Sequence, residues 1–320
     1  MAQHRATDVV ATGMGGWDLF PFNGAFYPSR LPKGFRKLAF YSRYFDLIEV
    51  NATFYNTDFR REHVERWLED VRENARFAFT VKLFRGYTHT FNATREDLSR
   101  IYRQLDTLAD AGRLGGLLIQ FPSSFKNTRE SREYLYRLSH AFRQYRMFLE
   151  VRNESWDTPL MYNFFQENRY HLVNVDLPAI NEHLPFHDLS WDGAAYFRMM
   201  GRNAQAWKAP WRLEADGKHM VSDRYCYRYS EAELQGLAAS IRRVESAVKN
   251  VYVVFHNDPH AHSIVNGFGL RHILDPSRRF LIPPTTLKAF PALRSISANP
   301  ASVSAPMVSS RAPLQASLAL

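Results

Sequence analysis

The feature of this sequence that most limits its fold is the alternation of short apolar runs with segments of helical periodicity. Eight runs rich in β-branched and aromatic residues recur along the chain, and each has the character of a buried strand. They begin at Val9, Leu47, Arg76, Gly115, Arg146, His171, Ala194 and Val251. Alternating strands and helices build a parallel sheet covered by helices, and eight such units favour closure of the sheet. The sequence therefore predicts an α/β fold of the TIM-type (β/α)8 barrel class.

Several of the intervening segments carry specific helix signals. Thr94 is placed to cap a helix whose apolar stripe ends at Leu108. Ser230 and Glu233 form a capping-box pattern ahead of a later stripe. Residues 64–71, after the second strand, show the same spacing of apolar residues. These signals predict helices between the strands.

Two connections depart from this rhythm. The segment 179–193, between strands six and seven, is too short for a full helix with both loops, so we expect a short helix or an irregular crossing. The segment 202–229, after strand seven, is long and rich in Trp and Tyr. It is either a lid over the barrel mouth or a loop held to the barrel by its own aromatic side chains. We expect residues 1–290 to form the barrel and the Ser-, Ala- and Pro-rich residues 291–320 to be a disordered tail.

Composition sets the class of protein and its partners. Of the 320 residues, 45% are hydrophobic and 23% are charged, which supplies a large core. The net charge of +9 favours acidic partners, although the basic residues are scattered among carboxylates as on solvated helix faces. A single cysteine, Cys226, excludes an internal disulfide framework. Without a signal peptide or an 18-residue apolar stretch, we expect a cytoplasmic protein with no membrane partner.

The carboxyl ends of the strands point to a functional site, because the active site of such barrels is built there. Each predicted strand delivers a polar or aromatic side chain at this end. The catalytic candidates are Glu49, Lys82, Glu150 and Asp176. The substrate-binding candidates are Trp17, Asn51, Tyr55, His89, Gln120, Arg152, Trp156, Tyr196, Arg198, His256 and Asn257.

Charge balance and strand geometry suggest that these groups meet. A buried charge requires a partner, because burying it alone is costly. Three acids and three bases of the set balance one another: Glu49, Glu150, Asp176, Lys82, Arg152 and Arg198. Side chains alternate along a strand, so residues two apart, such as Tyr196 and Arg198, point the same way. We expect one polar cavity at the barrel mouth, suited to a small or mid-sized polar ligand.

The individual roles leave alternatives open. Glu49 and Glu150 are either an acid/base pair or simple counter-charges for Lys82 and Arg152. Lys82 is either a desolvated amine that forms a Schiff base or a charged anchor for an anion.

The segment "FHNDPHAHSIVNG" has a composition that invites a metal, with His256, Asp258, His260 and His262. Pro259 interrupts a continuous helix there, and the histidine spacing matches no established metal framework, so we predict no metal site and no cofactor. A divalent metal remains the alternative. The glycines of "GMGGW" lack the spacing of a dinucleotide-binding loop.

Several segments together resemble a known family. They include "GGWDLFPFNGAFYP", "FDLIEVNATFYN", "FAFTVKLFRGYTH", "FLEVRNESW", "YFRMMGRN" and "VVFHNDPHAHSIVNG". In these segments the chain resembles domain-of-unknown-function family 72 (DUF72, YecE-like), from about Gly13 to Leu274. The resemblance implies a TIM-barrel-like fold and supplies no reaction. The chain departs from the family pattern at "GMGGW" and "FHND", where the family commonly has a serine before Gly-Trp and "FNN".

Function follows from the site as an expectation. We expect an enzyme of the hydrolase, lyase or isomerase type that uses acid/base chemistry on a small anionic or polyhydroxylated substrate at the barrel mouth. One alternative is a protein that binds or processes nucleic acid with its basic mouth. Another is a small-ligand binding protein without catalysis.

Overall fold

The chain folds into a closed barrel of eight parallel strands. The structure, a computed structural model, describes residues 9–180, 183–208, 210, 212–213 and 220–298. The barrel strands are β1 (Val10–Met14), β2 (Leu47–Val50), β3 (Ala78–Lys82), β4 (Leu114–Gln120), β5 (Met147–Glu150), β6 (Tyr170–Asp176), β7 (Ala194–Met199) and β10 (Asn250–Phe255). Their order around the barrel is β1-β10-β7-β6-β5-β4-β3-β2, and β2 pairs with β1 to close it. The prediction of a TIM-type barrel is confirmed.

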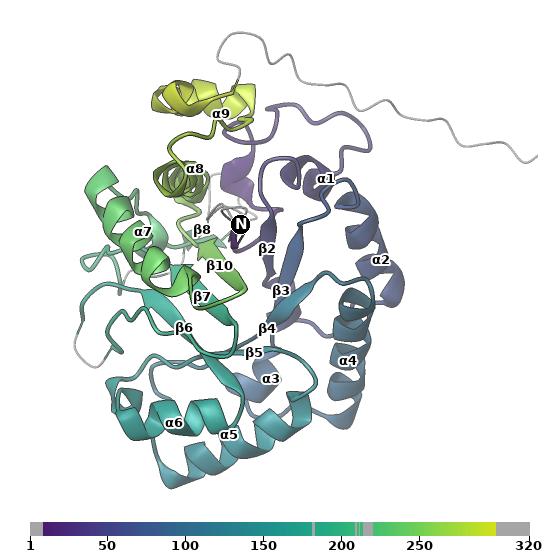
Figure 1. The fold of residues 1–320 in the computed structure, drawn as a ribbon. Coiled ribbons are helices and arrows are strands. Elements are labelled where there is room, and N and C mark those ends of the chain that lie inside the picture. The colour runs from purple at the N-terminus through teal and green to yellow at the C-terminus, as the bar shows by residue number, and fades with distance from the viewer. Residues whose placement is uncertain (1–8, 181–182, 209, 211, 214–219, 299–320) are drawn as a thin grey trace, which may run out of the picture.

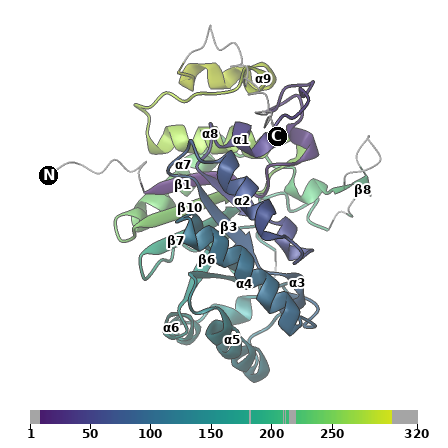
Figure 2. The same ribbon diagram turned by 90° about the vertical axis from the view of Figure 1, so that its right-hand side faces the viewer.

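Helices surround the strands (Figure 1, and from the side in Figure 2). They are α1 (Lys37–Tyr41), α2 (Arg61–Asp70), α3 (Arg85–Thr88), α4 (Arg95–Asp110), α5 (Arg129–Phe142), α6 (Pro159–Glu167), α7 (Glu231–Glu245), α8 (His262–Leu274) and α9 (Pro284–Ala289). The predicted caps are present: the Thr94 hydroxyl accepts from the backbone N–H of Asp97 (3.1 Å) at the start of α4, and Ser230 does the same for Glu233 (3.3 Å) at α7.

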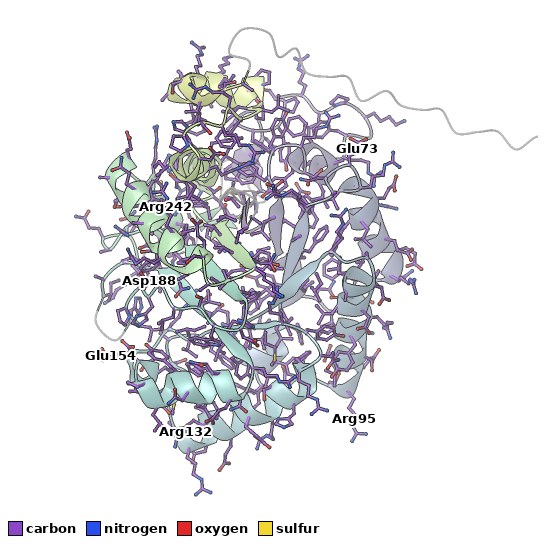
Figure 3. The ribbon with its side chains drawn as sticks, viewed as in Figure 1. Glu73, Arg95, Arg132, Glu154, Asp188 and Arg242 are labelled. Carbon is purple, nitrogen blue, oxygen red and sulfur yellow. The ribbon has the colours of Figure 1, made fainter. Side chains whose placement is uncertain are left out.

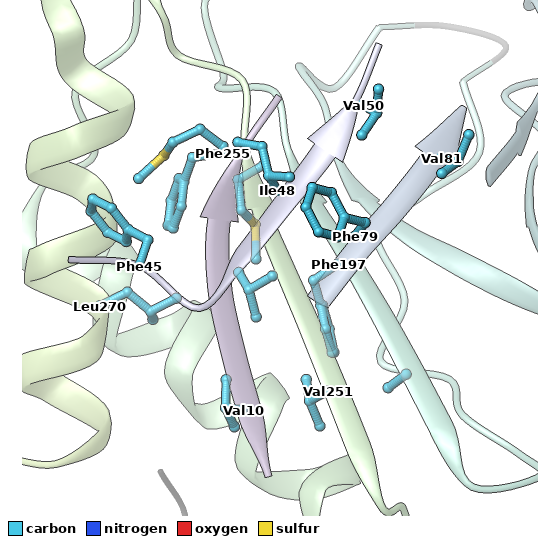
Figure 4. Close-up of a cluster of buried hydrophobic side chains, with 14 of the residues drawn as sticks. Val10, Phe45, Ile48, Val50, Phe79, Val81, Phe197, Val251, Phe255 and Leu270 are labelled. Carbon is cyan, nitrogen blue, oxygen red and sulfur yellow. The ribbon is translucent and has the colours of Figure 1, made fainter. Parts of the chain in front are cut away.

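Hydrophobic side chains form two cores on opposite faces of the strands. One lies between the barrel and its helices, where Phe45, Phe255 and Leu270 are among the residues that pack together (Figure 4). The other fills the inside of the barrel, where the rings of Phe148, Tyr196 and Tyr252 lie 4.7–6.1 Å apart. The inner core closes the bottom of the barrel and leaves its carboxyl-terminal end for polar side chains.

The two irregular connections are present as expected. Between β6 and β7, the described residues form no helix, and two isolated bridges, Asn153 to His183 and Trp191 to Ala194, fasten this crossing. The connection from β7 to α7 contains a short antiparallel pair, β8 (Arg212–Leu213) and β9 (Met220–Val221), which stands out on one side of the barrel in Figure 2. Trp211 of this connection lies outside the described residues.

The folded part of the chain extends beyond the predicted boundary at residue 290. Pro291–Ile296 forms a 3-10 helix whose Leu293 and Ile296 side chains are buried, and Ala298 donates its N–H to the Phe280 carbonyl (2.8 Å). The composition of this segment predicts disorder, but Leu293 and Ile296 are three apart and therefore lie on the same side of the 3-10 helix, where both are buried. The expectation of a disordered tail therefore fails for residues 291–298, and its remainder, residues 299–320, lies outside the described part of the chain. Among the described helices, none combines the length and hydropathy needed to cross a membrane.

Candidate functional site

A layer of charged side chains lies on top of the inner core. On four strands, a residue that points into the barrel is followed two positions later by a charged residue that points the same way. The pairs are Leu47–Glu49, Thr80–Lys82, Phe148–Glu150 and Tyr196–Arg198. This is the alternation of side chains expected along a strand. The charges are therefore brought together by strands distant in sequence, at the carboxyl end of the barrel.

Arg198 joins the two buried carboxylates of this layer. Its Nε lies 2.9 Å from Oε2 of Glu49, and its Nη2 lies 2.8 Å from Oε1 of the same carboxylate. Its Nη1 donates to Oε2 of Glu150. Glu49 and Glu150 have no exposed surface, and Arg198 is 2% exposed. The guanidinium thus offsets the burial of two carboxylates with a forked geometry.

Further donors complete the coordination of both carboxylates. The Tyr196 hydroxyl donates to Oε2 of Glu49 (2.7 Å), and His256 Nε2 lies 3.1 Å from Oε1. Arg152 Nε donates to Oε1 of Glu150 (2.7 Å). Every oxygen of the two carboxylates therefore has a partner.

Electrostatics holds both carboxylates in the ionised form. Burial favours the neutral acid, but the positive charge of Arg198 and the surrounding hydrogen bonds hold the pKa of Glu49 well below its ordinary value. Against the same cost of burial, Arg198 and Arg152 lower the pKa of Glu150 to about 2. A fully paired carboxylate of such low pKa is a poor proton carrier at neutral pH. The geometry therefore argues against Glu49 and Glu150 as an acid/base pair and favours their role as counter-charges, although the partner of Glu49 is Arg198 and not Lys82.

Lys82 lacks the carboxylate partner that the sequence suggested. Within the described residues it forms no ion pair, and its Nζ lies 4.1 Å from the centre of the Phe54 ring. Burial and the charge of Arg198 lower the pKa of Lys82 to about 7, since Glu49 and Glu150 compensate only in part. A substantial fraction of this amine is therefore neutral at physiological pH.

These groups border a cavity of about 570 Å³ at the carboxyl end of the barrel. Its wall includes Gly15, Asp18, Phe20, Asn51, Phe54, Tyr55, Lys82, His89, Gln120, Ser123, Arg152, Arg198, Trp207, Ser222, Arg224, Tyr225, His256 and Asp258. The volume is within the range of small-molecule sites. Eight of the predicted site residues line the cavity: Asn51, Tyr55, Lys82, His89, Gln120, Arg152, Arg198 and His256.

The polar wall is held by local contacts. Asn51 Nδ2 donates to the Gly15 carbonyl (2.6 Å), and the Gly15 position also gives room to His256, because a Cβ there would lie 2.4 Å from the His256 ring. Burial and the charge of Arg198 lower the pKa of His256, which keeps its imidazole neutral at pH 7. Gln120 Nε2 donates to the Phe121 carbonyl (2.6 Å).

His89 lies on the side of the cavity that holds Lys82 and Arg152. Its ring lies edge-on to Phe54, with the two ring centres 4.9 Å apart, and its Nδ1 contacts the Thr88 hydroxyl (2.9 Å). Burial, followed by the charges of Lys82 and Arg152, lowers the pKa of His89 to about 4. Arg152 uses its Nε for Glu150, and no described residue pairs with its two Nη atoms. This side of the cavity therefore offers hydrogen-bond donors to an anion.

Part of the connection between β7 and α7 covers the cavity. Trp207, Ser222, Arg224 and Tyr225 contribute to the wall from this segment. Some contacts of the segment are internal, such as the hydrogen bond from Asn203 Nδ2 to the Asp223 carbonyl (3.1 Å), and others reach the barrel, such as the hydrogen bond from the Tyr229 hydroxyl to Asp176 (2.6 Å). The choice between a lid and a fixed wall stays a prediction.

Asp176 does not join the charged layer. Its carboxylate accepts hydrogen bonds from Arg202 Nε (2.9 Å) and from the Tyr229 hydroxyl (2.6 Å). Both partners come from the connection after β7, which the sequence does not place relative to β6. The expectation that six charged groups converge is therefore wrong for Asp176, whose geometry fits a role in fastening that connection.

Four predicted substrate-binding residues lie outside the cavity wall. The Trp17 ring packs edge-on against Trp67, with ring centres 5.5 Å apart. Trp156 is fully buried, stacks on Phe125 and donates its indole N–H to the Phe125 carbonyl (2.8 Å). Period-two alternation stops at the strand end, so it does not fix the direction of these two aromatic side chains.

The other two residues outside the wall are polar and buried. Tyr196 is below the cavity, where its hydroxyl bonds Glu49 and Thr80. Asn257 is fully buried, and its Oδ1 accepts from Asn266 Nδ2 (3.0 Å). Both residues support groups of the wall and do not face a ligand directly.

Several residues of the cavity wall were not among the predicted ligand contacts, and the sequence contains a signal for some of them, including Phe54 and Asp258. Phe54 follows Asn51 directly after β2 and supplies the ring above which Lys82 lies. Asp258 follows His256 after β10, in the histidine-rich segment whose composition suggests a metal site. Both lie within four residues of the carboxyl end of a strand.

The histidines near β10 point in different directions. His256 contacts Glu49, whereas the rings of His260 and His262 lie 5.6 Å apart on the following turn. In the described part of the chain, no group of three or more His, Cys, Asp or Glu side chains is arranged to hold a metal ion. Metal dependence stays an open prediction.

Surface charge on the helices is locally mixed. Arg95 and Arg132 lie on the outside of the helical ring, as does Glu73 (Figure 3). Arg61 pairs with Glu65 (2.8 Å) and Arg129 with Glu133 (2.9 Å), each one helical turn apart. Such pairs give the described helices the character of solvated faces.

Comparisons with known proteins identify relatives of this chain. A family model described as "Protein of unknown function DUF72" matches residues 11–289. The chain is 28% identical over 287 residues to the UPF0759 protein YunF of Bacillus subtilis (strain 168), an alignment that covers 86% of this chain and 98% of YunF.

Two solved structures are similar along most of their length. A DUF72 family protein of Thermotoga maritima MSB8 matches with a TM-score of 0.70 and 28% identity, covering 83% of this chain and 99% of that protein. A DUF72 family protein of Enterococcus faecalis V583 matches with a TM-score of 0.71 and 26% identity, covering 86% of this chain and 98% of that protein. The match of the family model over nearly the whole barrel shows that this chain belongs to the DUF72 family.

Proposed function

We propose that this protein is an enzyme that acts on a small anionic carbonyl compound, and that Lys82 is the amine that reacts with the carbonyl carbon. The observation that carries this proposal is the position of Lys82: its Nζ faces a cavity of about 570 Å³ without a carboxylate partner among the described residues. A neutral lysine amine is a nucleophile toward carbonyl groups. A pKa of about 7 makes that form available at physiological pH.

The charged layer supports this role of Lys82. Arg198, together with Arg152, occupies the oxygens of Glu49 and Glu150, and neither carboxylate forms an ion pair with Lys82 among the described residues. The guanidinium charge also opposes protonation of Lys82. The layer therefore favours a neutral amine and does so with rigid, buried groups.

The chemistry begins with addition of the Lys82 amine to the carbonyl carbon. The nitrogen forms a bond to carbon and gives up a proton, the carbonyl oxygen takes up a proton as its π bond breaks, and the product is a neutral carbinolamine. Loss of water from this species gives an imine. The accessible Nη atoms of Arg152 suit the anionic group of the substrate, and Phe54 with Tyr55 provides an apolar surface beside it.

Reductive trapping tests the proposal. The protein is incubated at pH 7 with glyoxylate or pyruvate and cyanoborohydride, which reduces an imine to a stable secondary amine, and the modified lysine is located by peptide mass spectrometry. We expect the adduct predominantly on Lys82, one of eight lysines in the chain. Lys82→Met removes the adduct, whereas Lys249→Met, at an exposed site, leaves it unchanged.

The same experiment separates the proposal from its alternatives. Equal labelling of Lys82 and the exposed lysines by both carbonyl acids would refute a reactive amine in the cavity. A non-catalytic binding protein would hold such acids without forming the adduct.

A further inference from the structure

Asp258 is a carboxyl group of the cavity wall that no described cation neutralises. It follows β10, two residues after His256, and lines the same cavity as Lys82. Its Oδ1 accepts a hydrogen bond from the Ser263 hydroxyl (3.1 Å), and no described Lys, Arg or His forms an ion pair with it. Among the described residues, the buried carboxylates Glu49, Glu150 and Asp176 each pair with an arginine. Asp258, which is half-buried, differs from them because it has no such partner.

A strained turn holds Asp258 in place. His260 (φ 56°, ψ 20°) and Ala261 (φ 56°, ψ 30°) are two successive residues in the left-handed region, and neither is glycine. Such residues are strained and persist where their surroundings fix them, often at functional sites.

Hydrogen bonds on both sides of the turn supply the constraint. The Ala261 N–H donates to the Asp258 carbonyl (2.9 Å), and the Ser263 N–H donates to the Asn257 carbonyl (2.7 Å). The turn lets α8 begin at His262 while the Asp258 side chain stays in the cavity wall.

We propose that Asp258 is the proton donor for the reaction at Lys82, an inference that rests on the function proposed above. After the Lys82 nitrogen has added to the carbonyl carbon, the hydroxyl of the carbinolamine takes the proton of the Asp258 carboxyl and leaves as water. The nitrogen lone pair forms the C=N bond as the C–O bond breaks. The products are a protonated imine, water and the Asp258 carboxylate, which recovers a proton from solvent.

The surroundings of Asp258 keep it protonated for this step. Burial raises the pKa of Asp258 to about 7, and the negative charge of Glu49 adds to this effect, against the opposing hydrogen bond from Ser263. Glu49 from β2 and Tyr41 from α1 interact with it electrostatically. The other titratable or charged groups that line the same cavity include Asp18, Lys82, Arg198, Arg224 and His256. An acid and an amine with pKa values near 7 in one cavity form a suitable pair for proton transfer at neutral pH.

The first test measures the rate of imine formation in Asp258→Asn, which retains an acceptor for Ser263. With glyoxylate and excess cyanoborohydride at pH 6, followed by intact-protein mass spectrometry, we expect labelling of Lys82 to be about tenfold slower or more than in the wild type. Above about pH 8, where the Asp258 carboxyl has ionised, the wild-type rate falls to that of the variant. Asp275→Asn, at the other end of α8, is the matched control and behaves as the wild type.

The second test observes the proton itself. The infrared difference spectrum of wild type minus Asp258→Asn at pH 6 shows the carbonyl stretching band of a protonated carboxylic acid, and the band is lost with a midpoint near pH 7. Absence of this band at pH 6 overturns the role of proton donor, as do equal labelling rates of the two proteins. Failure of the wild type itself to form the Lys82 adduct refutes the proposed function instead, whether or not the band is present.

Discussion

Replacing Arg198 by Met removes the charge that holds two buried carboxylates while keeping much of the volume of the side chain. Both carboxylates are then fully buried. Glu49 keeps only the neutral His256 and the Tyr196 hydroxyl as partners, and Glu150 keeps only Arg152. Breaking a buried ion pair by removing one partner costs about 3–5 kcal/mol. We expect Arg198→Met to lower the free energy of unfolding by about this amount at pH 7.

The pKa of Glu150 gives a second estimate of the magnitude. In the folded protein it falls from 4.5 to about 2, with Arg198 as the largest stabilising cause. Since one pKa unit corresponds to about 1.4 kcal/mol, this carboxylate alone contributes about 3 kcal/mol at neutral pH. Most of that contribution is lost with Arg198, so the two estimates agree.

The pH dependence of stability reverses in the variant. In the wild type the depressed pKa values of Glu49 and Glu150 give a contribution that is fully present above about pH 4.5 and is lost as the pH falls towards 2. Without Arg198, burial raises the pKa of Glu49 above its unfolded value, so stability is highest in acid and is lost as the pH rises above about 4.5. The variant should therefore gain stability between pH 7 and pH 5, where the wild-type contribution is flat.

Urea unfolding followed by tryptophan fluorescence at pH 7 and pH 5 measures both effects. The double variant Arg198→Met with Glu49→Gln is the control, because it removes a stranded charge and should recover part of the loss. A loss below about 1 kcal/mol at pH 7, or no gain on acidification, would refute the reasoning that Arg198 holds the charged layer together.

Other predictions concern single side chains. Lys82→Met should raise the free energy of unfolding at pH 7 by up to about 4 kcal/mol, since the fall of the Lys82 pKa from 10.5 to about 7 disfavours the folded ammonium; the gain should shrink as the pH rises and be small at pH 10.5, and urea unfolding at the two pH values checks it. Thr94→Ala should cost about 1 kcal/mol through loss of the α4 cap and Thr94→Ser much less, as measured by thermal unfolding. Gly13→Ala should cost at least about 2 kcal/mol or prevent folding, because its Cβ would lie 1.9 Å from the Leu47 carbonyl oxygen; a soluble variant of unchanged melting temperature would contradict this. Trp156→Ala should lower the free energy of unfolding by about 3–5 kcal/mol, because it removes a fully buried side chain. Without urea and with saturating glyoxylate, the rate of Lys82 trapping should stay within about twofold of the wild type, which separates a role in packing from a role in ligand contact.

The fold, and the position of the charged layer at the carboxyl end of the barrel, could be predicted from the sequence because both follow from strand periodicity. The rule that residues two apart share a face placed Glu49, Glu150 and Arg198 inside the barrel together. Local capping chemistry at Thr94 and Ser230 fixed the starts of two helices in the same way.

The pairing of charges was not accessible, because it depends on distances across the barrel. The sequence contains three acids and three bases of balanced charge in this set. It does not show that Arg198 forms ion pairs with both Glu49 and Glu150, or that Arg202 pairs with Asp176. Lys82 is consequently left without a carboxylate partner among the described residues, and on this arrangement rests our proposal that it is a reactive amine and not an anchor. Residues beyond a strand end, such as Trp156, follow loop geometry that no short-range pattern describes.

We expect a substantial fraction of the Lys82 amine in the cavity to be neutral near physiological pH. Measuring the rate at which a small amine-reactive reagent modifies Lys82 as a function of pH, with Lys249 followed in the same digest, determines the pKa of Lys82 directly. A midpoint near 7 for Lys82 is the result that the structure leads us to expect. A midpoint for Lys82 that coincides with that of Lys249 would contradict the account.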